Sequence, residues 1–248
     1  MNFSDTVVSF LIPNRGGKDL PIVINNINTV YAKLNKEIIV IQQEDDLPFM
    51  RGQLYNIGVK FCTGAFVALT DNDIYHLREL PLIHLYSIFK RPLICFKYIS
   101  QITLKNNKPV ITKNQLMLNG MGAFNFMKKT DFIRANGFSN LYIGWGNEDW
   151  EFMRRFNNQY IRIPQNLGHL THPWRANLNP KNTELNRKLF REFSNRDFTK
   201  DGIKQTTYNL ISDEMHDTHR TIKVSGISTT PGFEYQSIIE EHFKLCSR

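Results

Sequence analysis

The sequence predicts an α/β protein whose mostly parallel sheet is covered by helices on both faces. Three short segments near the start are almost entirely apolar, which is typical of strands buried on both faces of a sheet. They alternate with two segments whose apolar residues recur at helical spacing. The expected strands are residues 7–12, 37–41 and 64–70, and the expected helices are residues 22–34 and 51–61. Since β-α-β units of this kind form parallel sheets, ligands should bind at the edge where these strands end, at residues 13–17, 42–46 and 71–73.

The second half of the chain is less regular. We expect one β-hairpin there, with its turn at Asn106-Asn107, and a basic amphipathic helix near the C-terminus. No internal repeat or linker is recognisable, so we expect one domain, residues 1–248, with a C-terminal elaboration. The expected helices are residues 80–89, 130–136, 151–157 and 183–193, and the expected strands are residues 93–99, 102–104, 110–112 and 120–127.

Composition narrows the class of protein. The apolar share of 41% and the charged share of 22% are those of an ordinary globular chain. A net charge of +8 favours anionic partners, but the basic residues are scattered, so we expect no nucleic-acid site. Three cysteines give no paired framework, which indicates a reducing compartment. Without an apolar run of about 18 residues or a signal peptide, we expect a soluble cytoplasmic protein with no transmembrane segment, or one held peripherally at the inner membrane face.

The most informative motif is Gly144-Trp145-Gly146-Asn147-Glu148-Asp149-Trp150-Glu151. Its glycines allow close approach of a ligand, and Trp145 offers a flat apolar face to a sugar ring. One carboxylate of the pair Glu148 and Asp149 could then accept a proton from a bound hydroxyl. The alternative is purely structural: Asn147 or Asp149 starts a helix, where acidic residues suit the helix dipole.

Two further groups of residues are candidate metal ligands. Asp71-Asn72-Asp73 directly follows the third strand, and carboxylates two residues apart can bind one divalent cation that holds a diphosphate. His169 and His172 would lie on one side of a helix or tight turn, as ligands to a transition metal. Asp73, His169 and His172 together would form a Mn²⁺ site. The alternatives are a turn or helix cap for the acids, and surface or core positions for the histidines.

Candidate phosphate ligands are Arg15 and Arg51, because guanidinium groups match the geometry of phosphate oxygens. Phe49, two residues before Arg51, could stack on a nucleotide base. The alternatives are ordinary surface charge for the arginines and a core position for Phe49.

These motifs, in this order, resemble the β-1,4-galactosyltransferase family, inverting glycosyltransferases of the GT-A fold. The resemblance runs from about Phe10 to Ile227 and implies a mixed, mostly parallel Rossmann-like sheet flanked by helices. It rests on Ile12-Pro13-Asn14-Arg15, the segment from Phe49 to Gly58, Asp71-Asn72-Asp73, Asn119-Gly120-Met121-Gly122-Ala123, Ala135-Asn136-Gly137-Phe138 with residues 144–150, and His169 to His172.

The resemblance implies a role for each matching residue. Asp149 matches the catalytic base, and Asp73 and His172 match ligands of the Mn²⁺ ion. His169 would be the third ligand; it lies where many members have a methionine ligand, and as a harder donor than methionine it would admit Mg²⁺ as well. The implied acceptor-binding residues are Glu148, Trp145 and Gly146. The implied donor-binding residues are Pro13, Arg15, Phe49, Arg51, Asp71, Asp73, Leu118 and Trp145.

Several positions depart from the family pattern. Asn147 replaces a glycine and Trp150 replaces an acid, so acceptor contacts should differ. Leu118 lies where vertebrate members have a tyrosine that limits the space near the donor's 2-substituent, and a smaller side chain there resembles members that accept GalNAc. Residues 181–184 do not match the family's pocket for an N-acetyl group.

The sequence therefore predicts a metal-dependent inverting transferase that moves Gal or GalNAc from the UDP-sugar to a sugar hydroxyl and forms a β-linkage. Residues 1–115 would bind the nucleotide-sugar, and residues 116–248 would supply the acceptor and metal half. One alternative is a chondroitin-polymerase-like GalNAc transferase of polysaccharide synthesis. Another is a non-catalytic protein of the same fold that binds sugar or UDP without turnover.

Overall fold

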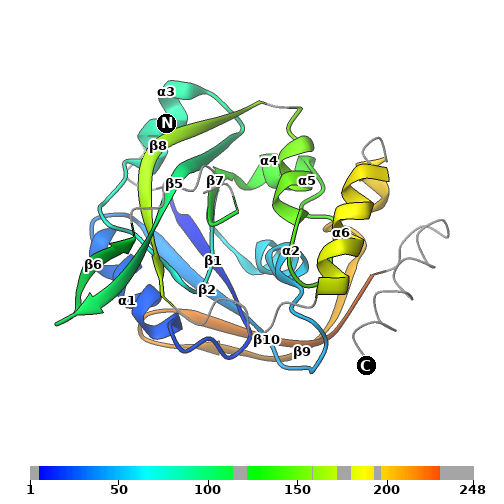
Figure 1. Ribbon diagram of the computed structural model, residues 1–248, viewed down its shortest axis with the longest axis horizontal. Helices are drawn as coiled ribbons and strands as arrows, with labels where there is room; N and C mark the ends of the chain where they lie inside the picture. Colours follow the sequence, from blue (N-terminus) through cyan, green and yellow to red (C-terminus); the bar gives the residue numbers. More distant parts are fainter. Residues whose placement is uncertain (1–5, 114–121, 158, 172–179, 193–196, 230–248) are drawn as a thin grey trace.

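The computed structural model describes residues 6–113, 122–157, 159–171, 180–192 and 197–229. Ten strands form one sheet in the order β4-β8-β5-β7-β3-β1-β2-β10-β9, with β6 paired to β5 (Figure 1). The strands are β1 (Val8–Asn14), β2 (Lys36–Gln43), β3 (Phe66–Thr70), β4 (Ile74–Tyr75), β5 (Leu93–Lys105), β6 (Lys108–Lys113), β7 (Phe124–Lys128), β8 (Tyr160–Leu170), β9 (Thr206–Met215) and β10 (Arg220–Thr229).

Helices cover both faces of this sheet, as the apolar strands predict. One core packs α1 and α3 against the sheet, and a second core on the other face packs α2, α4 and α5. Figure 1 shows α2, α4, α5 and α6 together to the right of the sheet. The helices are α1 (Leu20–Val30), α2 (Arg51–Phe61), α3 (Leu82–Phe89), α4 (Lys129–Arg134), α5 (Glu148–Arg154) and α6 (Pro180–Glu192), with a short 3₁₀ turn at Phe198–Lys200.

The sheet is mixed, as the resemblance implies, and both kinds of pairing are well represented in it. Parallel pairing joins β1 to β2 and β3, β2 to β10, and β5 to β8. The remaining pairs are antiparallel: β3–β7, β5–β7, β4–β8 and the hairpins β5–β6 and β9–β10. The β5–β6 hairpin turns at Asn106 and Asn107, whose φ angles of 50° and 60° are those of a two-residue hairpin turn. Short turns of this kind reverse the chain and so exclude parallel pairing.

The first three strands end at one edge of the sheet, as expected from their parallel pairing. Asn14, the last residue of β1, holds this edge together. Its side chain donates a hydrogen bond to Gln42 and accepts one from Asn72 Nδ2 at 2.7 Å and one from Gly17 N at 3.1 Å. Pro13 lies within β1, paired with β2, rather than ending the strand. A proline is tolerated there because the pairing of β1 with β3 on its other side has already stopped at Leu11.

A buried ionic network anchors α5 to the C-terminal part of the chain. The Arg155 guanidinium donates to the Glu151 carboxylate over 2.9–3.1 Å and to the Asp201 carbonyl at 2.9 Å. The Asp201 carboxylate in turn accepts from Asn140 N at 2.8 Å and from Ser139 Oγ at 2.5 Å. Since these charged groups are buried and fully bonded, the network fixes where α5 begins. That start lies at Glu148, three residues before the expected one.

Two further expectations concern the cysteines and the absence of a membrane span. Cys62 and Cys95 are buried free thiols, and Cys246 lies outside the described residues. In the part of the chain that the structure describes, no helix has the length and apolarity needed to cross a bilayer.

Candidate active site

Arg51, the first residue of α2, brings the two acidic motifs together. Its Nε donates to Asp71 Oδ1 at 2.5 Å, its Nη1 donates to Glu148 Oε1 at 3.2 Å, and its Nη2 donates to the carbonyl of Gly122. The Arg51 side chain is only 10% exposed. The end of β3, the start of α5 and the segment before β7 therefore meet at one guanidinium.

This arrangement differs from the role expected for Arg51. As a diphosphate ligand its guanidinium would face the bound nucleotide, but each of its three N–H-bearing nitrogens bonds to a protein group. A guanidinium engaged in this way positions carboxylates and balances their charge. The structure thus shows Arg51 linking the acids of the two motifs, and its contact with a diphosphate stays a prediction.

Asp71 is held by several groups at the end of β3. Besides its contact with Arg51, its Oδ1 accepts a hydrogen bond from Tyr55 Oη at 3.1 Å, and its backbone N–H bonds to the carbonyl of Ala123 at 3.4 Å. Burial raises the pKa of Asp71 above its usual range, and the nearby Arg51 charge opposes that shift. The Asp71 carboxylate is therefore part of a fixed network rather than a freely rotating ligand.

Glu148 is the first residue of α5, and its carboxylate is held from two sides. Oε1 accepts from Arg51, and Oε2 accepts from the backbone N–H of Gly146 at 3.0 Å. Burial and the adjacent Asp149 charge raise the pKa of Glu148 to about 7, against the opposing effect of Arg51. Asn147 occupies the N-cap position in a left-handed conformation (φ 66°), but its side chain makes no capping hydrogen bond. The purely structural interpretation of this motif therefore accounts for the start of the helix but not for the placement of its acids.

Asp149 is held differently from its neighbour. Its Oδ1 accepts from Trp150 N at 2.8 Å, and its Oδ2 lies against the backbone of Gly122. A Cβ added to Gly122 would lie 2.6 Å from that oxygen, so only glycine lets the carboxylate take this place. Asp149 is also less buried than Glu148. The two neighbouring acids thus face different surroundings.

Asp73 and His169 form the described part of the predicted metal site. His169 Nε2 lies 3.4 Å from Asp73 Oδ2, and the two residues are brought together by the pairing of β4 with β8. His169 therefore lies on a strand, and the expectation of a helix or tight turn is wrong for it. Two ligands of one octahedral ion, each at about 2.1 Å, are about 3 Å apart, so this carboxylate–imidazole pair is close to a ligand separation. His172 lies outside the described residues, and the described ones contain no cluster of three His, Cys, Asp or Glu side chains suited to a metal.

The remaining candidate residues are spread around the edge of the sheet. Pro13 is buried in β1, whereas Arg15 is exposed in the turn that follows. Phe49 is half-buried and packs on the second core, and its carbonyl accepts from Gly144 N at 3.1 Å. Trp145 is 53% exposed, and Gly146 beside it has a φ of 114°, which favours glycine. Leu118 lies outside the described residues.

Sequence reasoning missed three contributors to this site. Tyr55 contacts Asp71, Gly122 makes room for Asp149, and Asn14 ties together the edge of the sheet. Tyr55 lies four residues after Arg51 on the same helix, so helical spacing could have indicated it. The glycine at 122 gave a signal only as part of a motif, since the close contact that requires it comes from a distant loop.

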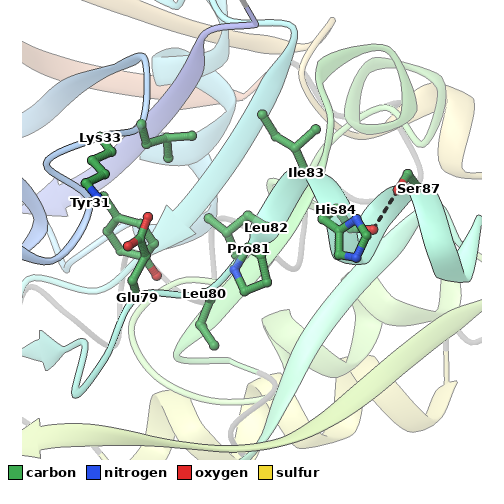
Figure 2. Close-up of a pocket in the computed structure, with 10 residues that line it drawn as sticks. Tyr31, Lys33, Glu79, Leu80, Pro81, Leu82, Ile83, His84 and Ser87 are labelled. Atoms are coloured by element: carbon green, nitrogen blue, oxygen red, sulfur yellow. Dashed lines mark hydrogen bonds between the residues drawn. The ribbon is translucent and has the colours of Figure 1, made fainter. Parts of the chain in front are cut away.

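Among the described residues, one surface cavity lies away from the predicted site residues and another adjoins them. A cavity of about 360 Å³ lies between the end of α1 and α3, lined by residues such as Tyr31, Glu79 and His84, and none of the predicted site residues lines it (Figure 2). A cavity of about 420 Å³ lies beside α5 and is lined in part by Asn147 and Trp150, which flank the acidic pair.

Comparison with known proteins indicates the fold and the class of protein to which the chain is similar. Residues 114–173 match a family model described as the N-terminal domain of galactosyltransferase. Over 94% of this chain the fold matches the catalytic domain of Drosophila β-1,4-galactosyltransferase 7 in complex with xylobiose, with a TM-score of 0.67 at 18% identity and 98% of that chain covered. A structure of a mutant of the same enzyme with manganese, UDP-Gal and xylobiose matches with a TM-score of 0.65 at 20% identity. The protein thus has the GT-A glycosyltransferase fold.

Curated relatives with similar sequences are β-1,4-galactosyltransferases. Human β-1,4-galactosyltransferase 4 is 26% identical over 225 residues, which cover 88% of this chain and 62% of the relative. Drosophila melanogaster β-1,4-galactosyltransferase 7 is 29% identical over 134 residues, which cover 52% of this chain and 38% of the relative. The chain thus spans less than two thirds of the length of these relatives. Together with the family model, they show that the chain is similar to β-1,4-galactosyltransferases.

The raised pKa of Glu148 predicts a pH-dependent stability. The carboxyl binds its proton more tightly in the folded protein (pKa about 7) than at its ordinary value of 4.5, so its contribution to stability is complete at low pH and is lost as pH rises through about 7. Relative to Glu148→Gln, the free energy of unfolding of the wild type should fall by at most about 1.4 kcal/mol per pH unit between pH 4.5 and about 7. Urea unfolding at a series of pH values measures it. Glu79→Gln, an exposed acid elsewhere, is the control, and a wild-type curve parallel to that of Glu148→Gln would contradict the assignment.

Proposed function

We propose that this chain is a metal-dependent inverting glycosyltransferase that transfers Gal or GalNAc from its UDP-sugar to a sugar hydroxyl, forming a β-linkage. The observation that carries the proposal is the contact of Arg51 with both Asp71 and Glu148. Through it, a candidate donor-binding motif at the end of β3 lies beside a candidate acceptor-binding motif at the start of α5. Transfer between two bound sugars needs such a meeting of two half-sites.

In this proposal Asp149 is the general base. It takes the proton of the acceptor hydroxyl while that oxygen bonds to the anomeric carbon of the donor sugar. The bond between the anomeric carbon and the diphosphate breaks on the opposite side, its electron pair leaves with UDP, and the configuration inverts. Glu148, held by Arg51 and the backbone N–H of Gly146, would fix the acceptor hydroxyl beside the base. Trp145 would cover the sugars with its exposed ring.

Asp73, His169 and His172 would hold the metal ion, Mn²⁺ or Mg²⁺. The carboxylate–imidazole pair of Asp73 and His169, 3.4 Å apart, fits such an ion. When bound, a divalent cation there would stabilise the charge of the leaving diphosphate. The similar Drosophila enzyme is described in complex with manganese and UDP-Gal, which supports this choice of cofactor and donor class.

The donor nucleotide would lie along the edge formed by β1, β2 and β3. Pro13, Phe49 and Asp71 would contact the nucleoside, and the exposed Arg15 would reach the diphosphate. Leu118 would set the space near the donor's 2-substituent and so the choice between Gal and GalNAc. The acceptor class is a carbohydrate, as for the Drosophila enzyme with xylobiose.

Assays with several sugar donors distinguish the proposed function from two others. A chondroitin-polymerase-like GalNAc transferase of polysaccharide synthesis would use UDP-GalNAc alone. A non-catalytic protein of this fold would bind UDP or sugar without turnover. Assays with UDP-Gal, UDP-GalNAc and UDP-GlcNAc, with the product linkage determined by NMR, distinguish all three.

Replacing the proposed base tests the mechanism. Asp149→Asn should lower kcat by about 10²–10⁴-fold, which is the usual contribution of a general base, and should leave UDP affinity unchanged. Asp217→Asn, at the exposed tip of the β9–β10 hairpin, is the control and should keep wild-type activity. Near-normal transfer by Asp149→Asn would show that another group takes the proton.

Removing a proposed metal ligand should separate metal binding from folding. Asp73→Asn should weaken Mn²⁺-dependent UDP binding at least about tenfold, because loss even of groups that only orient metal ligands costs 10–100-fold. Calorimetric titration of UDP with and without Mn²⁺ measures this, with Asp217→Asn again as the control. UDP binding that is equally tight without metal, in wild type and Asp73→Asn alike, would remove the metal from the proposal.

A further inference from the structure

The cavity beside α5 has a composition suited to a ligand. Its volume is about 420 Å³, and it is lined by Asn147, Trp150, Met153 and Arg154 of the α5 segment, Tyr160 of β8 and Phe190 of α6. Three of these six are aromatic, one is cationic and none is acidic. Flat aromatic faces suit the apolar faces of sugar rings, and an arginine suits an anionic group.

This cavity lies next to the proposed base but on another face of the helix. Residues 147, 150 and 154 share one helical face, since side chains three or four positions apart are neighbours. Asp149 lies between Asn147 and Trp150 in sequence and points to Gly122. One helical turn rises only about 5.4 Å, so the cavity begins within a turn of the reacting acid. A chain of sugars bound at the acidic pair could continue into it.

Two guanidinium groups stand over the aromatic lining. Arg154 Cζ lies 3.6 Å from the centre of the Phe190 ring, and its Nη1 donates to the carbonyl of Phe190 at 3.1 Å. Arg162 Cζ lies 5.8 Å from the Trp150 ring centre and 5.5 Å from that of Tyr160. Both cations are thus held over rings that line the cavity, and this orders them without neutralising their charge.

The Arg162 guanidinium makes few hydrogen bonds to the protein. Its Nε is buried and has no hydrogen-bond partner among the residues the structure describes, and its Nη2 reaches only the Tyr160 hydroxyl at 3.5 Å. The one acid of α5 beyond the catalytic pair, Glu151, is already bound to Arg155. Arg162 does not itself line the cavity, but it places a positive charge against the Trp150 and Tyr160 rings that do.

We propose that this cavity is a second acceptor subsite, which binds an anionic sugar residue adjacent to the one that receives the transferred sugar. The proposal rests on the proposed function and specifies its acceptor: a saccharide carrying a carboxylate or a phosphate group. This saccharide would stack on Trp150 and Tyr160 and pair with Arg154, while the Arg162 charge, held against the same two rings, would add to the attraction. The two kinds of anion share the chemistry that the site recognises and are separated by the test.

The test uses disaccharide acceptors that differ in one group. Each disaccharide is prepared with a hexuronic acid as its second residue, with the same residue reduced to the neutral hexose, and with that hexose 6-phosphorylated. For the wild type we expect the KM of the preferred anionic form to be at least about tenfold below that of the neutral form, as one charge-assisted hydrogen bond would give. The ratio of the carboxylate and phosphate forms identifies the anion.

Variants locate the effect. Arg154→Gln and Arg162→Gln remove the charge and leave a shorter polar side chain, and each should raise the KM for the anionic acceptor about tenfold while leaving the KM for the neutral acceptor and kcat unchanged. Arg187→Gln is the matched control, because this exposed arginine lies on α6 but does not line the cavity. Loss of a cation that merely stabilised the fold would affect both acceptors equally.

The outcomes separate this proposal from the proposed function. Equal KM values for the anionic and neutral acceptors in the wild type, with transfer intact, overturn the subsite and leave the transferase in place. A preference for anions that survives in both arginine variants also overturns it. No transfer to any acceptor would instead count against the proposed function, and direct calorimetric titration of the three disaccharides would then decide whether the cavity binds anions.

Discussion

The three-way contact of Arg51 is the interaction on which the site depends. Its guanidinium joins Asp71 after β3, Glu148 at the start of α5, and the carbonyl of Gly122 before β7. These segments are far apart in sequence, and the acids among them would repel each other without a cation between them. Because Arg51 is almost fully buried, its charge is poorly screened and the three segments are held firmly. A single residue thus turns separate motifs into one site.

Other contacts hold the segments that Arg51 joins. The network of Arg155, Glu151 and Asp201 fixes where α5 begins, and so fixes the position of Glu148 and Asp149 in its first turn. Gly122 then leaves room for the Asp149 carboxylate. At the neighbouring edge, Asn14 joins β1, β2 and the turn that contains Asn72. The acids are therefore placed by rigid elements, which suits groups that must act at a defined distance from a substrate.

Much of the fold was predictable because its signals are local. The apolar strands, the helix Arg51–Phe61 and the Asn106-Asn107 turn follow from periodicity and turn chemistry within a few residues. The antiparallel pairing of β7 was not predicted, because nothing within that strand records the direction of its partner. The strands β9 and β10 were not predicted at all. The candidate site, too, was predictable only where its signals are local. The acids were found from their motifs. The role of Arg51 instead depends on a partner 97 residues away, and the strand position of His169 depends on its pairing with β4.

The measurement that tests this account most directly is the effect of Arg51→Lys on catalysis and on nucleotide binding, measured side by side. Lysine keeps the charge, but its single nitrogen cannot take the three positions that the guanidinium nitrogens of Arg51 occupy. If Arg51 positions the acids, kcat should fall about 100-fold, as a misplaced catalytic group causes, while the Kd for UDP with Mn²⁺ stays within about threefold of wild type. A Kd weakened about tenfold or more with kcat nearly unchanged would show instead that Arg51 binds the diphosphate, and would contradict the account.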